Sequence, residues 1–292
     1  MGMGILGQLV ANGLLLGGVF ALISIGLTLI FGIVRVVNFA HGEILMAGMY
    51  CAWLLATQLG LHPYAAAIPL AAVFFAAGCL IQRFIIQPLL GEDAHIQIFA
   101  TVGLGTALAN LALVLFSADL RSVDVPWARL PLQVLGVSVA QGMLVAFVVS
   151  MLATAGLIVF LGRTHLGRAI RAVAQNRYAA PLMGIDVNGI YVVTFGLGTA
   201  AVGLAAAVLA PVYPVFPTVG SYFVLTAFVV VVLGGMGSLA GAIAGSLIVG
   251  LTDSLAGYYV APDLKEVVVF CLFLGILVLR PAGLFGVRGA AA

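Results

Sequence analysis

Long apolar runs, separated by short polar segments, account for most of this amino-acid sequence. The first run covers residues 5–34 and carries only four polar side chains in thirty positions, Gln8, Asn12, Ser24 and Thr28. Further runs cover residues 44–61, 64–86, 96–116, 137–161, 190–210, 222–251 and 267–279. A helix needs about 20 apolar residues to cross a bilayer, whereas a membrane β-barrel shows short alternating segments. The runs therefore predict an all-α, polytopic transmembrane bundle of eight or nine helices.

The composition allows no soluble alternative. The chain is 64% hydrophobic and 7% charged, whereas soluble domains are about 25% charged. A lipid bilayer is thus the expected surrounding. A net charge of +2 with no basic stripe indicates no nucleic-acid partner. No linker or second domain is visible, so we expect one membrane unit over residues 1–292.

Two of the runs are broken by polar or glycine-rich groups. Residues 5–34, about 45 Å as a helix, are followed by NFAHGE (38–43), and residues 222–251 are interrupted by GGMGS (234–238). Paired interruptions in the two halves of a transporter point to its translocation path. We expect that path at Asn38, His41, Gly42, Glu43, Gly234, Gly235, Gly237 and Ser238. The alternative is that both breaks are only kinks. Between the runs, Pro211, Pro214 and Pro217 predict a stiff external turn.

The polar groups contain no recognisable catalytic set. Glu43 lies near the membrane interior, where a charge marks a pathway or a structural pair, and we favour a cap on the following half-helix over contact with a solute. His41 is not followed by an HExxH pattern, and His62, His95 and His165 are scattered, so no metal site is expected. Walker and GxSxG motifs are also missing from the sequence. A transporter, a channel or a structural membrane protein remains, not an enzyme, and no cofactor is expected.

One segment, residues 162–187, is rich in arginine. It carries Arg163, Arg168, Arg171 and Arg177, with no acid before Asp186. An arginine at the bilayer centre costs about 2.5–3.5 kcal/mol, so the segment lies in water, and its charge places it in the cytoplasm. The loop 117–133 balances two acids against two bases and fits the outer side.

We expect the arginine-rich segment to be helical as far as Met183, where Gly184 stops it, and to form a docking surface. The alternative is a solvated loop whose arginines only set the orientation. If this segment and the C-terminal tail share the cytoplasmic side, the number of spans between them is even. That condition favours a run at 222–251 that makes two short crossings, or that enters the bilayer, breaks and returns.

Four stretches carry a resemblance to a known family. They are GLTLIFGIVRVVNFAHGEILMA (26–47), LGRAIRAVAQNRYAAPLMGIDV (166–187), VVLGGMGSLAGAIAGSLIVG (231–250) and VLRPAGLFG (278–286). Together they resemble, over essentially the whole chain, the LivH-type permease of branched-chain amino-acid ABC importers. The resemblance implies a multi-pass protein of the bacterial inner (cytoplasmic) membrane that moves branched-chain or similar amino acids into the cytoplasm.

The resemblance also implies partners and a coupling site. The partners are a second homologous permease subunit, two cytoplasmic ABC ATPase subunits and a periplasmic or extracellular solute-binding protein. Residues 167–184 match the family's coupling helix, which seats on an ATPase. The implied coupling residues are Gly167, Arg168, Arg171, Ala172, Arg177, Ala179, Ala180 and Gly184. The chain departs from the family pattern at QNRY (175–178), where acidic residues are common in relatives, and at Pro181.

The transported solute stays open. The same fold would serve urea, short amides or aromatic acids. A passive channel is a different class, because Asn38-Phe39-Ala40 superficially resembles the NPA signature of water channels. That fold needs two copies on inverted halves, and the sequence has no second copy at the matching place.

Overall fold

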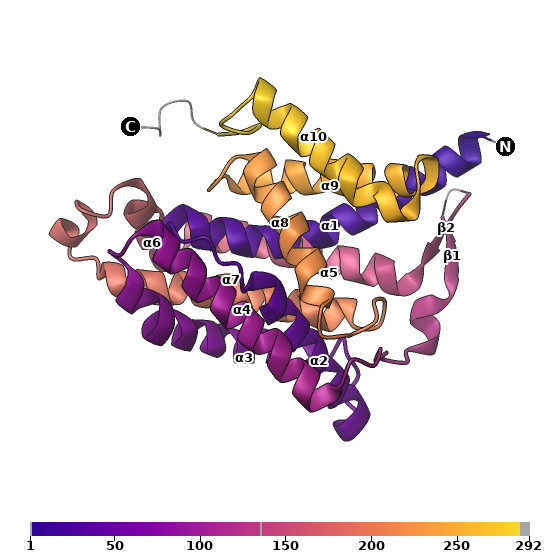
Figure 1. Ribbon diagram of the computed structural model, residues 1–292, viewed down its shortest axis with the longest axis horizontal. Helices are drawn as coiled ribbons and strands as arrows, with labels where there is room; N and C mark the ends of the chain where they lie inside the picture. Colours follow the sequence, from indigo (N-terminus) through magenta and orange to yellow (C-terminus); the bar gives the residue numbers. More distant parts are fainter. Residues whose placement is uncertain (1, 135, 287–292) are drawn as a thin grey trace.

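The computed structural model describes residues 2–134 and 136–286, and these residues form a bundle of ten α-helices (Figure 1). The helices are α1 Gly2–Val34, α2 His41–Leu59, α3 Ala67–Ile81, α4 Ala94–Phe116, α5 Gln141–Arg163, α6 His165–Gln175, α7 Val187–Leu209, α8 Val219–Gly234, α9 Leu239–Tyr259 and α10 Lys265–Leu279. Six helical segments in this part of the chain are long and apolar enough to cross a bilayer. The predicted all-α transmembrane bundle is confirmed.

Short elements connect the helices. The π-helix η1 Gln82–Ile86 and the 3₁₀ turn η2 Gln87–Leu89 extend α3, while η3 Pro126–Arg129, η4 Ala180–Met183 and η5 Pro262–Leu264 lie in loops. Strands β1 Pro131–Val134 and β2 Val137–Ala140 form an antiparallel hairpin. The prediction of helix from residue 137 was therefore wrong for four residues. Val137 and Val139 alternate with Ser138 as in a strand, and Gly136 supplies the left-handed turn at φ 80°.

The run at 222–251 divides into two helices. This division was favoured because an even number of spans was expected between the arginine-rich segment and the C-terminal tail. α8 ends at Gly234 and α9 begins at Leu239. The run at 5–34, in contrast, is one continuous helix of 33 residues, about 50 Å long. Its break comes after Val34, where Arg35 takes a left-handed conformation at φ 62°.

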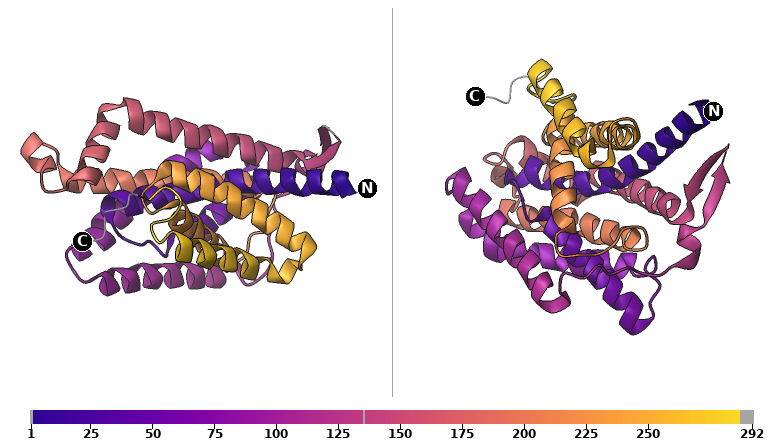
Figure 2. Two further views of the ribbon diagram at one scale, coloured as in Figure 1. Left: turned by 90° about the horizontal axis from the view of Figure 1, so that it is seen from above. Right: turned by 45° about the vertical axis from the view of Figure 1, so that its right-hand side comes forward.

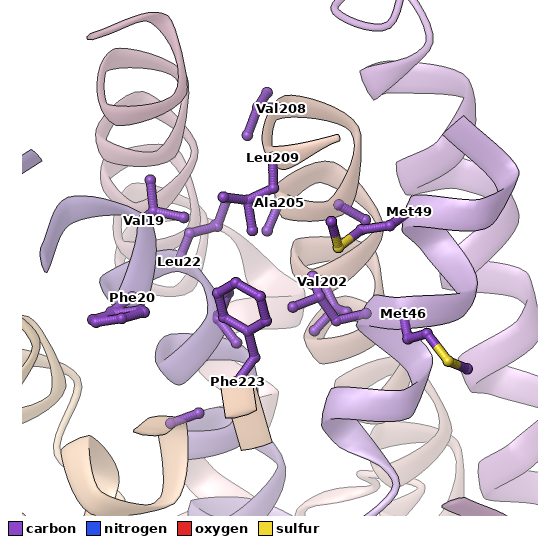
Figure 3. Packing of buried hydrophobic residues seen from close by; sticks show 14 of the residues in the cluster. Val19, Phe20, Leu22, Met46, Met49, Val202, Ala205, Val208, Leu209 and Phe223 are labelled. Carbon is purple, nitrogen blue, oxygen red and sulfur yellow. The ribbon is translucent and has the colours of Figure 1, made fainter. Parts of the chain in front are cut away.

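Helices α1 and α7 form the centre of the bundle. Both are mostly buried, whereas α3, α4 and α5 are mostly exposed. Apolar side chains from α1, α2, α7 and α8 meet between them, with Phe223 facing Leu22 and Val202 (Figure 3). Glycine lets the two central helices touch, because a Cβ atom added at Gly26 would lie 2.6 Å from the carbonyl oxygen of Gly198. Such close backbone contact is a main source of helix association in lipid.

The bundle has two chemically different ends. Helices α1, α3, α5 and α10 run toward the end that carries α6, at the left of Figure 1 and of the left view in Figure 2. The elements that lie or end there carry the arginines at this end of the bundle, the arginine-rich end, and these are Arg35, Arg83, Arg163, Arg168, Arg171, Arg177 and Arg280. The segment after α10 returns there as well, because the Leu284 amide donates to the Leu233 carbonyl at 2.9 Å.

The opposite end carries the hairpin and the start of α1. The Ser138 amide donates to the Gln8 side-chain oxygen at 2.9 Å, which fixes α1 beside β2. The loop with Asp119, Arg121, Asp124 and Arg129 lies at this end too. The excess of arginine at the other end is the asymmetry that orients membrane proteins.

We predict that Gly26→Ala destabilises the bundle, whereas Gly156→Ala does not. The added methyl group at Gly26 strikes backbone, and overpacking of this kind costs about 1–3 kcal/mol. Gly156 lies on α5 with nothing within 4 Å of an added Cβ atom. Thermal unfolding of both variants in the same detergent measures the difference. Equal unfolding temperatures would contradict the close α1–α7 contact.

Candidate functional site

Two helices begin part-way along the bundle and not at its ends. After α1, residues 35–40 turn back along it, because an imidazole nitrogen of His41 lies 3.0 Å from the carbonyl oxygen of Ile23. α1 continues for eleven residues beyond Ile23. The start of α2 therefore lies beside the middle of α1. Helix α8 starts at the same level, because Gly220 in its first turn contacts Gly42 in the first turn of α2.

Glycine permits these two helix starts to touch. A Cβ atom at Gly42 would collide with the carbonyl oxygen of Gly220 and would lie 2.7 Å from Cβ of Val224. A Cβ atom at Gly220 would in turn collide with the Glu43 carboxylate. We call the meeting of Gly42, Glu43, Gly220 and Ser221 the crossing point.

The Glu43 carboxylate occupies the crossing point. Glu43 is only 8% exposed, and the Ser221 hydroxyl donates to its Oε1 atom at 3.1 Å. Its Oε2 atom is buried without a hydrogen-bond partner among the described residues. On the far side, Gly105 of α4 covers the side chain, since an added Cβ atom there would lie 3.4 Å from Cγ of Glu43.

The carboxylate lies at two helix N-termini at once. Glu43 is in the first turn of α2, and its partner Ser221 is in the first turn of α8. Each N-terminus carries roughly half a positive charge, so one carboxylate compensates both. Glu43 thus lies where the dipole of α2 favours a carboxylate, although no side-chain hydrogen bond caps that helix. Its contact with the first turn of α8 was not part of the sequence interpretation.

Asn38 and His41 contact the chain's own backbone. The Asn38 side-chain oxygen accepts from the Ala40 amide at 3.2 Å, and both Asn38 and His41 are buried. Their polar groups hold the linker 35–40 in its course along α1.

The second break forms a tight turn elsewhere in the bundle. Ser238 caps α9 by accepting from the Gly241 amide at 3.1 Å, Gly234 packs on Gly241, and Gly235 and Gly237 are left-handed at φ 103° and 85°. An added Cβ atom at Gly32 would lie 3.1 Å from Cα of Gly237. Gly32 is nine residues beyond Ile23 on α1, which is about 13 Å along a helix. The two expected breaks therefore lie at different levels along α1.

The arginine-rich segment is helical over only part of the predicted length. Thr164 caps α6 by accepting from the Gly167 amide at 2.9 Å. The helix ends at Gln175, because the Asn176 side-chain oxygen accepts from the amides of Tyr178 and Ala179, each at 3.0 Å. Such an Asx turn competes with the helix. Prediction of helix through Met183 was wrong for residues 176–179, and η4 follows before Gly184 turns at φ 76°.

Helix α6 is strongly two-faced. Ile170 and Val173 pack in a buried cluster with Ile33 of α1 and Ile190 of α7. Gly167 is also buried, against the backbone of Phe160 and Leu161, so its small size serves the α5–α6 contact. Ala180 is buried as well, and Ala172 is half-buried.

The outward face combines cations with apolar side chains. Arg168, Arg171, Arg177 and Ala179 are exposed, as is Gly184. Tyr178, Leu182 and Met183 are 76%, 86% and 81% exposed. Arg177 lies over the Tyr178 ring at 5.0 Å and donates to its hydroxyl at 2.9 Å, and this hydrogen bond raises the pKa of Arg177. Arginine and exposed apolar side chains together are typical of a protein-binding surface.

Comparison with known proteins gives a consistent result. A family described as the branched-chain amino acid transport system permease component matches residues 9–277. The chain is 34% identical to the high-affinity branched-chain amino acid transport permease BraD of Pseudomonas aeruginosa, over 96% of this chain and 95% of that one. It is 31% identical to LivH of Escherichia coli K12, with the same two coverages. A probable branched-chain amino acid permease of Methanocaldococcus jannaschii is 27% identical over 96% of this chain and 92% of its own.

We predict that Glu43→Gln lowers the free energy of unfolding by about 1–2 kcal/mol, since the amide keeps an acceptor but loses the charge that compensates two helix N-termini. Glu92→Gln, an exposed residue of the loop between η2 and α4, is the matched control. Thermal unfolding in detergent measures both variants. If Glu43→Gln proved as stable as the control, the compensation described at the crossing point would be refuted.

Proposed function

The chain belongs to the family of permease components of branched-chain amino acid transport systems, and we propose that it is the membrane subunit through which branched-chain or similar amino acids enter the cytoplasm. The relatives BraD and LivH carry branched-chain amino acids in their names. The solute proposed for this chain rests on that relationship. An external binding protein would make the finer selection among solutes.

The observation that carries the proposal is the outward face of the arginine-rich segment. Residues of α6 pack on α1 and α7 through their apolar side, which leaves Arg168 and Arg171 exposed on the opposite side. Arg168 contacts the His165 ring at 2.8 Å and Arg171 donates to the Gly162 carbonyl at 3.5 Å, and a partner would add to these contacts or replace them. Arginine suits such contacts because its planar fork binds carboxylates with two hydrogen bonds. We propose that a cytoplasmic ATPase subunit docks here, and that its second copy docks on the homologous permease that completes the pore. The arginine excess at this end supports insertion in the bacterial inner membrane with α6 inside the cell.

The crossing point is the proposed link between docking and transport. Helix α6 is joined to α5 by one residue, Thr164, and it packs on the beginning of α7. A push on α6 would tilt α5 and α7 as rigid bodies. The short linkers 35–40 and 210–218 would absorb the motion, because they carry the chain to the crossing point outside any helix. Ser221 is exposed beside Glu43, so we place the solute path along this part of α2 and α8. For the turn 234–238 we propose a hinge between α8 and α9.

We predict that cells lacking this chain lose most uptake of labelled leucine, isoleucine and valine, and that reintroducing the chain restores it. Urea, acetamide and benzoate in the same panel represent the solutes that the same fold would also serve. Loss of uptake confined to one of these three, with aliphatic amino acids unaffected, would overturn the proposed solute. ATP depletion is the second arm, because a passive channel would continue to equilibrate its solute.

We predict that Arg168→Glu combined with Arg171→Glu reduces uptake at least about tenfold, because two of the three positive charges of the docking face are reversed. The variant should still insert, since its buried apolar face is unchanged. Arg129→Glu, an exposed arginine at the opposite end, is the control. Uptake and co-purification of the ATPase subunits measure the effect. Wild-type uptake by the double variant would exclude the docking role.

A further inference from the structure

A cavity of about 610 Å³ opens at the arginine-rich end of the bundle. It lies between the end of α3 and the beginning of α7, and its wall includes Arg83, Gln87, Asp186, Gly189, Val192 and Val193. None of these residues belongs to the crossing point or to the exposed arginine face. The π-helix η1 carries Arg83 to the cavity, and π-helical turns are often found at functional sites.

Two opposite charges face this cavity without neutralising each other. Among the described residues, the ion pairs are Arg121–Asp119 and Lys265–Asp253, so Arg83 and Asp186 are not within ion-pair distance of one another. Both side chains are exposed. Each therefore keeps its hydrogen-bonding capacity for a ligand.

Asp186 has one oxygen engaged and one available. Its Oδ1 atom accepts from the Asn188 amide at 3.1 Å and caps α7. A Cβ atom added at Gly189 would lie 2.6 Å from Oδ2. Glycine at this position thus leaves the second carboxylate oxygen uncovered, and an ammonium group is the natural partner for it.

The rest of the wall adds an acceptor and an apolar patch. The side-chain oxygen of Gln87 is buried without a hydrogen-bond partner in the described chain. Val192 and Val193 are half-buried on the first turns of α7. A cation, an anion, an amide and an aliphatic surface in one cavity match the parts of an aliphatic α-amino acid.

We infer that this cavity binds a free aliphatic α-amino acid, with Arg83 on its carboxylate, Asp186 on its ammonium group and the two valines beside its side chain. The inference rests on the proposed function for the side of the membrane, since the arginine-rich end then faces the cytoplasm and the ligand is the transported product. A phosphatidylethanolamine headgroup carries the same two kinds of charge, so the test must separate the two sources.

The test is equilibrium binding of tritiated L-leucine to the purified importer complex in nanodiscs, without ATP and without the external binding protein. We expect saturable binding that Arg83→Gln and Asp186→Asn each weaken at least about tenfold, since each removes a charged hydrogen bond. Asparagine caps helices as well as aspartate does, so Asp186→Asn keeps the start of α7 intact. Arg163→Gln and Glu92→Gln, exposed residues of the same end that do not line the cavity, should bind as the wild type does.

Two leucine analogues, each without one of the two charged groups, test whether the cavity recognises both charges. Isovalerate lacks the ammonium group and isopentylamine lacks the carboxylate, so neither should compete with leucine. Competition by either one, or binding that survives both cavity variants, would overturn the inference. Equal binding in nanodiscs with and without phosphatidylethanolamine supports the free amino acid. If leucine bound only in nanodiscs without phosphatidylethanolamine, the lipid headgroup and not the free amino acid would be the ligand of the cavity.

Uptake measured in proteoliposomes made from the same purified complexes, with ATP and the external binding protein supplied, keeps the two proposals apart. Normal ATP-dependent leucine uptake with no leucine binding at the cavity refutes only the inference. Binding that depends on Arg83 and Asp186, without any uptake, refutes the proposed function and leaves the site standing.

Discussion

The structure depends on how two helix N-termini are tolerated inside an apolar bundle. The first amides of a helix have no partner within it, and hydrocarbon supplies none. Here the His41 amide donates to Asn38, the Val219 amide to Phe216 and the Ser221 amide to Thr218, at 3.3, 3.1 and 3.2 Å. These local bonds satisfy part of each first turn, and the Glu43 carboxylate compensates the remaining positive charge of both.

The Glu43 carboxylate can compensate both helix N-termini only because α2 and α8 begin close together. One carboxylate can serve two helices only where their backbones touch, and side chains at Gly42 or Gly220 would push them apart. The short lengths of α2 and α8 follow from this arrangement, because each begins beside the middle of α1 and ends at or beyond one end of the bundle. α1, with its 33 residues, is the common reference along which both are placed. The apolar core in Figure 3 then fills the space between them.

The sequence predicted features that local chemistry determines. Apolar run length located the helices, and the polar group at 38–43 and the glycines at 234–238 located two real breaks. Which breaks meet was not predictable in this way. The contact between Glu43 and Ser221 joins residues 178 positions apart, and no local pattern marks it. The three prolines before α8 were interpreted as an external turn. Val215 among them does pair with Arg121 of the loop after α4, but the same segment also delivers α8 to the crossing point.

The end of α6 was predictable in principle and was missed. Asn176 is a residue that favours turns over helix interiors, and Pro181 cannot donate to a preceding carbonyl. Both signals lie within the stretch that was interpreted as one helix. Arg83 and Asp186 were missed for a different reason. They are about a hundred positions apart in the sequence, and only the antiparallel packing of α3 on α7 brings them to one cavity.

Neighbouring residues at the start of α8 tie it to both sides of the bundle. Ser221 donates to Glu43 of α2, while the Tyr222 hydroxyl donates to Asp253 of α9 at 3.3 Å. Lys265 at the start of α10 also contacts Asp253, with 3.1 Å between its ammonium nitrogen and a carboxylate oxygen. This ion pair is partly buried, with the Lys265 side chain 30% exposed and that of Asp253 9%. Desolvation offsets much of the attraction in such a pair, but removing one partner is costly. It therefore serves to fix which surfaces meet. A motion that moves the start of α8 away from α2 therefore strains the polar contacts of Tyr222 with α9 and α10. Helix α9 itself is packed on α1, since a Cβ atom added at Gly17 would lie 2.8 Å from the carbonyl oxygen of Ser246.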